Sequence, residues 1–372
     1  MGEDPVLVMR DNEGQVRAFL NVCRHRGNRL CRADAGNAAT FTCAYHGWTY
    51  RNDGRLVGVP YLKEAYHGEL QRERWGLTPV AQLDSYKGLL FATFDPDAPP
   101  LREYLGEMSW YLDAFFDRRE GGIEVIGAHK WVMPCNWKFP AENFGGDLYH
   151  VEWSHLSAIE TRLSPGTAPR TGSTVSPGNG HVVICFGPND VCDPPVPEIL
   201  DYEQQIRPEV ERRLGPRSGL VTPIVGTMFP NFSMLRATSR TFRVWHSAGA
   251  RKNRGLVVDL HRQSGAATCQ GSDPIGRHPG LQPGRHLRAG RHGQLAGVHA
   301  HLSRRVSRRS LLNTQMGLGH ERFDDSLQGW ASEFRMSESN HRQFYGRWAQ
   351  LMTGRSWAEM SPAIIPAGAS HA

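Results

Sequence analysis

The chain has 372 residues, of which 39% are hydrophobic, and a formal net charge of +6 at pH 7. This length exceeds what one simple core usually serves, so we expect two domains. No apolar run approaches the roughly 18 residues of a membrane-spanning helix, and no secretory leader is evident; both favour a cytoplasmic protein.

Residues 1–97 are rich in short β-prone runs separated by Gly, Asp and Asn, which predicts a small all-β domain. The predicted strands are Val6–Met9, Val16–Val22, Ala39–Thr42 and Leu89–Phe94. Asp53-Gly54 predicts a tight hairpin turn. The Pro-rich stretch 95–100 predicts a linker to the next domain.

Residues 98–372 mix helical and β patterns, which predicts an α+β domain with an antiparallel sheet. The predicted helices are 101–116, 135–156, 198–214 and 337–352. The predicted strands are 123–133, 220–229, 232–236 and 241–246.

Two short Cys/His pairs dominate the first domain. Cys23-Arg-His25 is followed, after 17 residues, by Cys43-Ala-Tyr-His46. Two thiolates and two imidazoles suit a Rieske [2Fe–2S] centre, in which two Cys bind one iron and two His bind the other. A structural zinc also accepts Cys2His2, but fingers usually pair Cys with Cys and His with His. The seven cysteines do not form a convincing disulfide pattern, so a Rieske cluster in a free-thiol protein is the favoured interpretation.

A second possible metal site lies in the predicted helix 135–156, which carries Asp147, His150 and His155. Two His and one carboxylate form the facial triad of non-haem Fe(II) oxygenases. The spacing of five between the histidines is imperfect, because five residues turn by about 140° on an ideal helix. Both can bind one iron only if the helix is overwound or broken there. Ordinary surface or core histidines are the alternative.

The motifs together resemble one family. The Cys/His loops, Cys43-Ala-Tyr-His46-Gly-Trp, and the pattern Asn143-x3-Asp147-x2-His150-x4-His155 are similar to those of the large (α) subunits of bacterial aromatic-ring-hydroxylating dioxygenases. The resemblance runs from residue 1 to about 250 and returns at 312–321. It implies a Rieske domain lacking its first strands and a helix-grip-like catalytic domain.

The resemblance also implies roles for individual residues. Cys23, His25, Cys43 and His46 would hold the cluster, and His150 and His155 would bind mononuclear Fe(II). Asp147 would connect His150 to the cluster histidine His46 of a neighbouring subunit, with Asn143 at the pocket edge.

The implied partners are a ferredoxin or reductase that delivers electrons from NADH, a homotrimer of α subunits and, in some members, a small β subunit. The implied reaction is cis-dihydroxylation of an aromatic hydrocarbon or aromatic acid by O2. Two rivals remain: a monooxygenase or demethylase on the same scaffold, and a protein that only transfers electrons.

Residues 251–309 have a foreign composition. They contain no Phe, Trp, Tyr, Met or Glu, and 12 Lys and Arg against two Asp. A nucleic-acid-binding tail is disfavoured, because the segment lies between two family-like stretches and has no stacking residues. We interpret the segment as a frameshifted translation, since shifting the frame lets 289–298 encode Glu-Gln-Asp-Asp-Met-Asp-Asn-Trp-Gln-Glu, like the family's third-ligand motif. As written, it predicts a loop or poorly packed region and only two protein ligands for the mononuclear iron.

Overall fold

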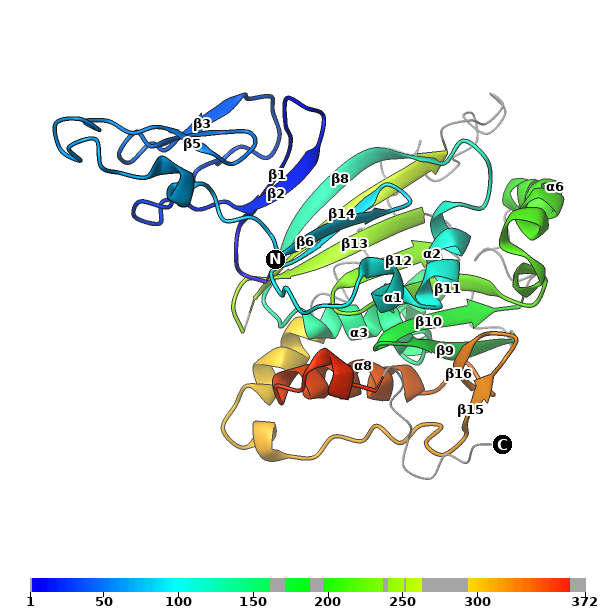
Figure 1. Ribbon diagram of the computed structural model, residues 1–372. Helices are drawn as coiled ribbons and strands as arrows, with labels where there is room; N and C mark the ends of the chain where they lie inside the picture. The colour runs from blue at the N-terminus through cyan, green and yellow to red at the C-terminus, as the bar shows by residue number, and fades with distance from the viewer. Residues whose placement is uncertain are drawn as a thin grey trace. The chain divides into compact units, whose positions relative to one another are not determined.

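The chain forms two compact units, Met1–Leu101 and Arg102–Ala372 (Figure 1). The computed structural model describes residues 2–160, 171–187, 197–236, 240–250, 252–262 and 294–361. Within this described part of the chain, no helix is long and apolar enough to cross a membrane.

The first unit is built from short antiparallel strands and one 3-10 helix, η1 (Arg72–Trp75). Its sheets are β1 (Val6–Arg10) with β2 (Val16–Leu20), β3 (Thr40–Thr42) with β4 (Thr49–Arg51) and β5 (Leu56–Gly58), and β6 (Gln82–Tyr86) with β7 (Leu89–Thr93). The four predicted strands are confirmed as β1, β2, β3 and β7.

The core of this unit contains both cysteines of the Cys/His pairs. The buried residues are Phe19, Cys23, Leu30, Cys43, Trp48, Tyr50, Leu56 and Leu77. The predicted turn at Asp53-Gly54 joins β4 to β5 and is confirmed. Gly54 has a φ of 90°, and a Cβ there would lie 2.4 Å from the Phe19 ring. Only glycine fits this turn, because both the backbone angle and the close ring exclude a side chain.

The second unit is organised around a nine-stranded antiparallel sheet (Figure 1). In spatial order its strands are β15 (Glu321–Asp324), β16 (Gly329–Ser332), β9 (Gly172–Gly178), β10 (His181–Phe186), β11 (Thr222–Met228), β12 (Phe232–Arg236), β13 (Arg240–Ser247), β14 (Asn253–Arg262) and β8 (Ile123–Met133). The predicted α+β class with an antiparallel catalytic sheet is confirmed, as are the strands at β8, β11, β12 and β13.

Helices pack against this sheet and on one another. They are α1 (Leu101–Leu105), α2 (Met108–Phe116), α3 (Lys138–Gly146), α4 (Val151–Ser154), α5 (Leu156–Glu160), α6 (Pro197–Leu214) and α8 (Ser339–Met352), with short 3-10 turns at η2 (Pro216–Gly219), η3 (Ser307–Arg309) and η4 (Trp357–Glu359). The predicted helices at α6 and α8 are confirmed. Thr227 of β11 donates a hydrogen bond to the Ala141 carbonyl at 2.7 Å, which fixes α3 on the sheet.

Two helices that were predicted to be continuous are interrupted in the structure. The predicted helix 101–116 is interrupted at Gly106, whose φ is +49°, so α1 and α2 are separate. The predicted helix 135–156 begins only at Lys138 and ends at Gly146, and α4 and α5 follow as short separate turns. Asp147 adopts a φ of −92° and a ψ of 84°, outside the helical region.

The predicted loop over 251–309 was wrong over 253–262 and 294–302, whereas residues 303–309 form turns and a short 3-10 helix. Residues Asn253–Arg262 form β14, which pairs with β13 on one side and with β8 on the other. Leu256, Val257 and Val258 supply a short β-branched and apolar run that the average composition concealed. Residues 294–302 are helical, and Leu295 packs against the core beneath α3. Residues 263–293 lie outside the described residues.

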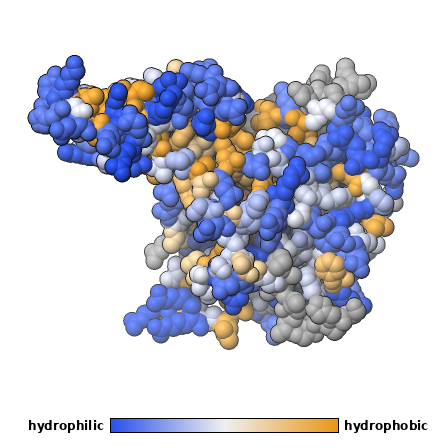
Figure 2. All heavy atoms as spheres, in the orientation of Figure 1, coloured by the Kyte–Doolittle hydropathy of each residue, from blue (hydrophilic) through white to orange (hydrophobic). Residues whose placement is uncertain are grey.

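The visible surface is mostly hydrophilic, with hydrophobic residues gathered near β8 (Figure 2). Strand β8 lies at one edge of the large sheet and exposes Val125, Ile126 and Val132.

Candidate metal centres

The two Cys/His loops have the same backbone design. In the first loop, the Cys23 amide donates to the Asn28 carbonyl and the Gly27 amide donates to the Cys23 carbonyl. In the second, Cys43 donates to Trp48 and Gly47 donates to Cys43, at the same sequence offsets. Gly27 and Gly47 have φ values of 73° and 72°. Each loop therefore turns back at a glycine and directs its Cys and His to one side.

The four predicted cluster residues lie together. Cys23 and Cys43 are each 2% exposed, so the thiol pair lies inside the unit. The His25 and His46 rings meet edge to face with centroids 4.5 Å apart, at an interplanar angle of 73°. Buried sulfurs and paired imidazoles nearer the surface match the two Cys and two His that a [2Fe–2S] Rieske centre needs.

Hydrogen bonds surround both sulfurs. The Tyr50 hydroxyl lies 3.4 Å from the Cys23 sulfur and accepts the Arg24 amide, which leaves its proton for the sulfur. The Asn28 side-chain amide donates to the Cys43 sulfur at 3.5 Å. Burial opposes ionisation of Cys43, but hydrogen bonds from the Tyr45 amide and from Asn28 outweigh it and lower the pKa of this thiol. Such contacts favour a thiolate and tune an iron–sulfur potential.

The histidines are suited to bind metal as neutral ligands. Burial, together with the neighbouring His46 and Arg26, lowers the pKa of His25. The His25 Nδ1 atom is buried and has no hydrogen-bond partner within the described part of the chain. A buried ring nitrogen without a partner fits a coordination bond. Asn28 was missed by sequence reasoning, because its contact with the Cys43 sulfur depends on the folded loops.

The second site forms where α3 breaks. The Asp147 carboxylate accepts the His150 amide at 3.1 Å and lies 3.1 Å from His150 Nδ1. Asn143 donates to the same carboxylate at 2.9 Å. With Nδ1 directed to Asp147, His150 keeps Nε2 for a ligand. That atom is buried and has no hydrogen-bond partner among the described residues. A carboxylate that orients a histidine is typical around metal-binding imidazoles.

The broken helix brings both histidines together. His150 immediately precedes α4 and His155 immediately follows it, and their ring centroids are 5.0 Å apart at 84°. His155 is 9% exposed. The helix is therefore broken in this region, as it must be if two histidines five residues apart are to bind one iron.

Electrostatics keep Asp147 ionised. Burial alone would raise the pKa of Asp147, but the hydrogen bond from His150 and the nearby His341 lower it to about 2. His341, from α8, was missed by sequence reasoning, because its proximity to Asp147 arises only when α8 packs on α3. Within the described residues, no three His, Cys, Asp or Glu side chains converge on one metal position.

The glycine pair Gly145-Gly146 allows α3 to lie close to its neighbours. A Cβ on Gly145 would lie 2.6 Å from Val182, and one on Gly146 would lie 2.7 Å from the Asn340 Cβ. Asn340 donates to the Gly145 carbonyl at 2.7 Å and to the Val183 carbonyl at 3.0 Å. These contacts hold the end of α3, and therefore Asp147, against β10 and α8.

Comparisons with known proteins match both units. Residues 1–86 match the Rieske [2Fe-2S] domain, and residues 101–249 match the catalytic domain of ring-hydroxylating α subunits. The chain is 37% identical to the α subunit of biphenyl 2,3-dioxygenase from Rhodococcus jostii (strain RHA1), over 98% of this chain and 82% of that protein. It is 32% identical to the large oxygenase component of the naphthalene 1,2-dioxygenase system of Pseudomonas aeruginosa, over 96% and 83%.

A solved structure is similar over the same range. Naphthalene 1,2-dioxygenase from Rhodococcus sp., bound to indole, superposes with a TM-score of 0.80 and 33% identity, covering 95% of this chain and 85% of that chain.

Proposed function

Because the chain belongs to the large (α) subunits of Rieske aromatic-ring-hydroxylating dioxygenases, we propose that its two Cys/His loops and its broken helix are the two metal centres of that family. Cys23, His25, Cys43 and His46 hold the [2Fe–2S] cluster. His150 and His155 bind the mononuclear iron. The observation that carries this assignment is the matched pair of loops, which brings two buried sulfurs and two adjacent imidazoles together.

The protein is the terminal oxygenase subunit of a multicomponent aromatic-ring dioxygenase. Electrons from NADH reach it through a reductase and ferredoxin, and its substrate is an aromatic small molecule. When bound, the cluster would supply electron storage and the mononuclear iron O2 reduction, the chemistry that cis-dihydroxylation of an arene requires.

The chain's own residues prepare the mononuclear site. Asp147 holds the Nδ1 proton of His150, which fixes the tautomer and leaves Nε2 as the metal-binding atom. Asn143 donates to Asp147 and fixes the carboxylate. Both therefore act by positioning a ligand, and Asp147 also lies on the proposed electron path from His46 of a neighbouring subunit.

Cysteine variants test the cluster assignment. Cys43→Ser removes a proposed ligand, so we expect loss of the visible cluster absorption and of the cluster EPR signal. Cys31→Ser is the matched control, since the Cys31 thiol donates to the Ala33 carbonyl. Retention of a normal cluster in Cys43→Ser would refute the assignment.

Iron content and isotope labelling separate the rival functions. We expect three iron atoms per chain in the loaded protein and two in His150→Ala, with the exposed His129→Ala as control. Two iron atoms in the unmodified protein would favour electron transfer alone. With labelled O2, a dioxygenase places both oxygen atoms in the product, whereas a monooxygenase or demethylase places one.

We further propose an assembly of three α subunits, with or without a small β subunit, because transfer from one cluster to the neighbouring iron requires adjacent copies. Light scattering of the purified protein measures this directly. A cytoplasmic location follows from the NADH that supplies the electrons.

We also propose that about 251–309 is a frameshifted translation of the segment that carries the third iron ligand. In the shifted frame the Asp-Asp pair falls at 291–292. Nearby Gln294 accepts a hydrogen bond from Ser154, the residue before His155, at 2.7 Å. That contact brings the described residue Gln294 next to the segment that carries the proposed iron ligand His155. The nucleotide sequence tests the frame, and codons that cannot encode the shifted motif would exclude it.

A further inference from the structure

A chain of aromatic rings leads from the surface of the first unit to one of the cluster histidines. Trp75, the last residue of η1, is 38% exposed, whereas Trp48 is only 4% exposed. Their ring centroids are 6.4 Å apart, at 83°. Trp48 stacks on His25 with centroids 5.0 Å apart and planes 7° apart. Two indole rings therefore connect solvent to His25, on which the proposed cluster depends.

Arg24 fixes the outer ring. Its guanidinium donates to Thr78 at 3.0 Å and to the Gly76 carbonyl at 3.5 Å, and lies 5.8 Å from the centre of the Trp75 ring. A cation over an indole face is stabilising. Trp75 is therefore held at the surface in one place, as an anchor residue of an interface would be.

Arg24 brings the first cluster loop next to η1, and both segments are rich in arginine. Arginines lie on the first cluster loop and on η1, with Glu73 as the acidic residue of η1; they are Arg24, Arg26, Arg29, Arg72 and Arg74. All but Arg72 are exposed. A positive patch of this kind attracts a negatively charged protein and accelerates its encounter.

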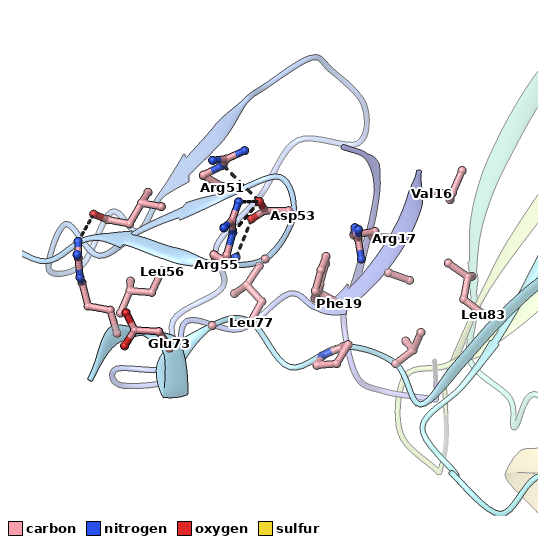
Figure 3. Close-up of a pocket in the computed structure, with 17 residues that line it drawn as sticks. Val16, Arg17, Phe19, Arg51, Asp53, Arg55, Leu56, Glu73, Leu77 and Leu83 are labelled. Atoms are coloured by element: carbon pink, nitrogen blue, oxygen red, sulfur yellow. Dashed lines mark hydrogen bonds and ion pairs between the residues drawn. The ribbon is translucent and has the colours of Figure 1, made fainter. Parts of the chain in front are cut away.

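A groove lined in part by η1 lies in the same unit (Figure 3). Its volume is about 700 Å³, and Arg72, Glu73 and Leu77 lie along one wall. Phe19, Leu56 and Val80 contribute apolar lining, and Arg55 lines the groove as an ion pair with Asp53. An apolar side chain at the rim of an acidic partner fits such a groove.

We propose that this face, composed of Trp75, the five arginines and the groove, is the docking surface for an acidic iron–sulfur ferredoxin, and that Trp75 and Trp48 form the electron entry to His25. The proposal rests on the proposed cluster assignment. One electron leaves the reduced ferredoxin, which is oxidised, and reduces the oxidised cluster of this chain; no covalent bond changes. His25 then marks the entry side and His46 the exit side.

The test uses the loaded full-length protein and a reduced [2Fe–2S] ferredoxin of net negative charge. Its affinity is measured by calorimetry at several salt concentrations, and cluster reduction is followed by stopped-flow absorbance. We expect affinity to fall with salt, because ions screen surface charges. Trp75→Leu should weaken binding about thirtyfold and slow reduction at saturating ferredoxin, and Trp75→Phe should retain part of both.

Matched arginine variants test the charge. Arg74→Gln should weaken binding about threefold at low salt and have no effect at high salt. Arg10→Gln is the control, since Arg10 is exposed on β1 and its side chain donates to the Gly14 carbonyl. Equal behaviour of Arg74→Gln and Arg10→Gln, together with unchanged binding and reduction in Trp75→Leu, would overturn the proposal. So would a variant effect seen only with a flavin reductase and not with ferredoxin.

Two further measurements separate this proposal from the cluster assignment. Cluster EPR and visible circular dichroism should be unchanged in all variants, which excludes misfolding. Dithionite, a small reductant that needs no docking, should reduce every variant at the same rate. A chain that forms no [2Fe–2S] cluster at all contradicts the cluster assignment, whereas normal dithionite reduction with unaltered ferredoxin kinetics in Trp75→Leu contradicts only the docking surface.

Discussion

A buried carboxylate in α6 organises three arginines, and its removal should strongly destabilise the catalytic unit. Glu203 is 8% exposed. Both its oxygens accept from Arg118, at 2.9 and 2.6 Å. Arg236 of β12 lies 2.8 Å from it, and Arg240 of β13 donates at 3.1 Å. This one side chain therefore ties α6 to the end of α2 and to two sheet strands.

The expected loss of unfolding free energy follows from the buried arginines that Glu203→Gln leaves without a negative charge. The substitution keeps the shape but removes the single negative charge, so three guanidiniums face one another. Arg236 is 3% exposed and Arg118 is 10% exposed. Breaking a buried ion pair by removing one partner costs about 3–5 kcal/mol, because the remaining charge stays buried. We expect a loss of that size in the unfolding free energy of the catalytic unit.

The pH dependence of this network has a defined sign. Burial alone would raise the pKa of Glu203, but Arg236 and Arg118 outweigh it and hold the pKa far below the ordinary value of 4.5. A lowered carboxyl pKa contributes stability that is present above 4.5 and is lost as the pH falls further. The unmodified protein should therefore lose this contribution in acid, and Glu203→Gln should not.

Urea unfolding followed by far-UV circular dichroism measures the effect, with visible cluster absorption reporting the first unit separately. Glu211→Gln is the matched control on the same helix. Its partner Arg207 lies 2.9 Å away, and both side chains are nearly half exposed, so we expect a change below about 0.5 kcal/mol. A loss below about 1 kcal/mol in Glu203→Gln would refute the reasoning about uncompensated buried charge.

Three other perturbations give further tests. Gly146→Ala places a Cβ 2.7 Å from the Asn340 Cβ, so we expect the unfolding free energy measured in urea to fall by about 1–3 kcal/mol and the iron content to decrease. An unchanged urea midpoint would mean that Asn340 moves aside without cost. Tyr50→Phe removes the hydroxyl beside the Cys23 sulfur, so a redox titration should give a cluster potential lower by roughly 40 mV, and an equal or higher potential would contradict the hydrogen bond. Burial raises the pKa of Glu142 to about 7, so stability should fall as the pH rises from 4.5 through 7, and Glu142→Gln should flatten that slope in denaturation measured at pH 5 and pH 8.

Local patterns allowed the first unit to be predicted well. Each cluster loop is closed by hydrogen bonds between residues four and five positions apart, so its shape depends on few residues. The spacing Cys23-x-His25 and the glycine at Gly27 therefore carry structural information by themselves. The hydrogen bond between Tyr50 and the Cys23 sulfur did not follow from the sequence, because it joins residues 27 positions apart.

Average composition misled where a short element lies inside an unusual segment. The basic, Gly-rich stretch 251–309 predicted a loop, yet Asn253–Arg262 is an interior strand of the large sheet, next to the edge strand β8. Strand β14 pairs along its length with β8 and with most of β13, so neighbours on both sides satisfy its backbone. A ten-residue strand forms when its own side chains suit a sheet and a neighbouring strand lies on each side, whatever the composition of the residues that follow.

The second metal site shows how a conflict within the sequence identified a structural feature. Two histidines five residues apart point in different directions on a straight helix. Asp147 resolves this, because its carboxylate accepts the His150 amide and so replaces a helical hydrogen bond with a side-chain one. The chain then restarts as α4, and the two rings meet at 5.0 Å. The same carboxylate that ends the helix also orients His150, so one side chain both breaks the helix and positions the ligand. Asp147→Asn should therefore preserve the break more fully than it preserves metal affinity, since an amide still accepts the backbone hydrogen bond but carries no charge.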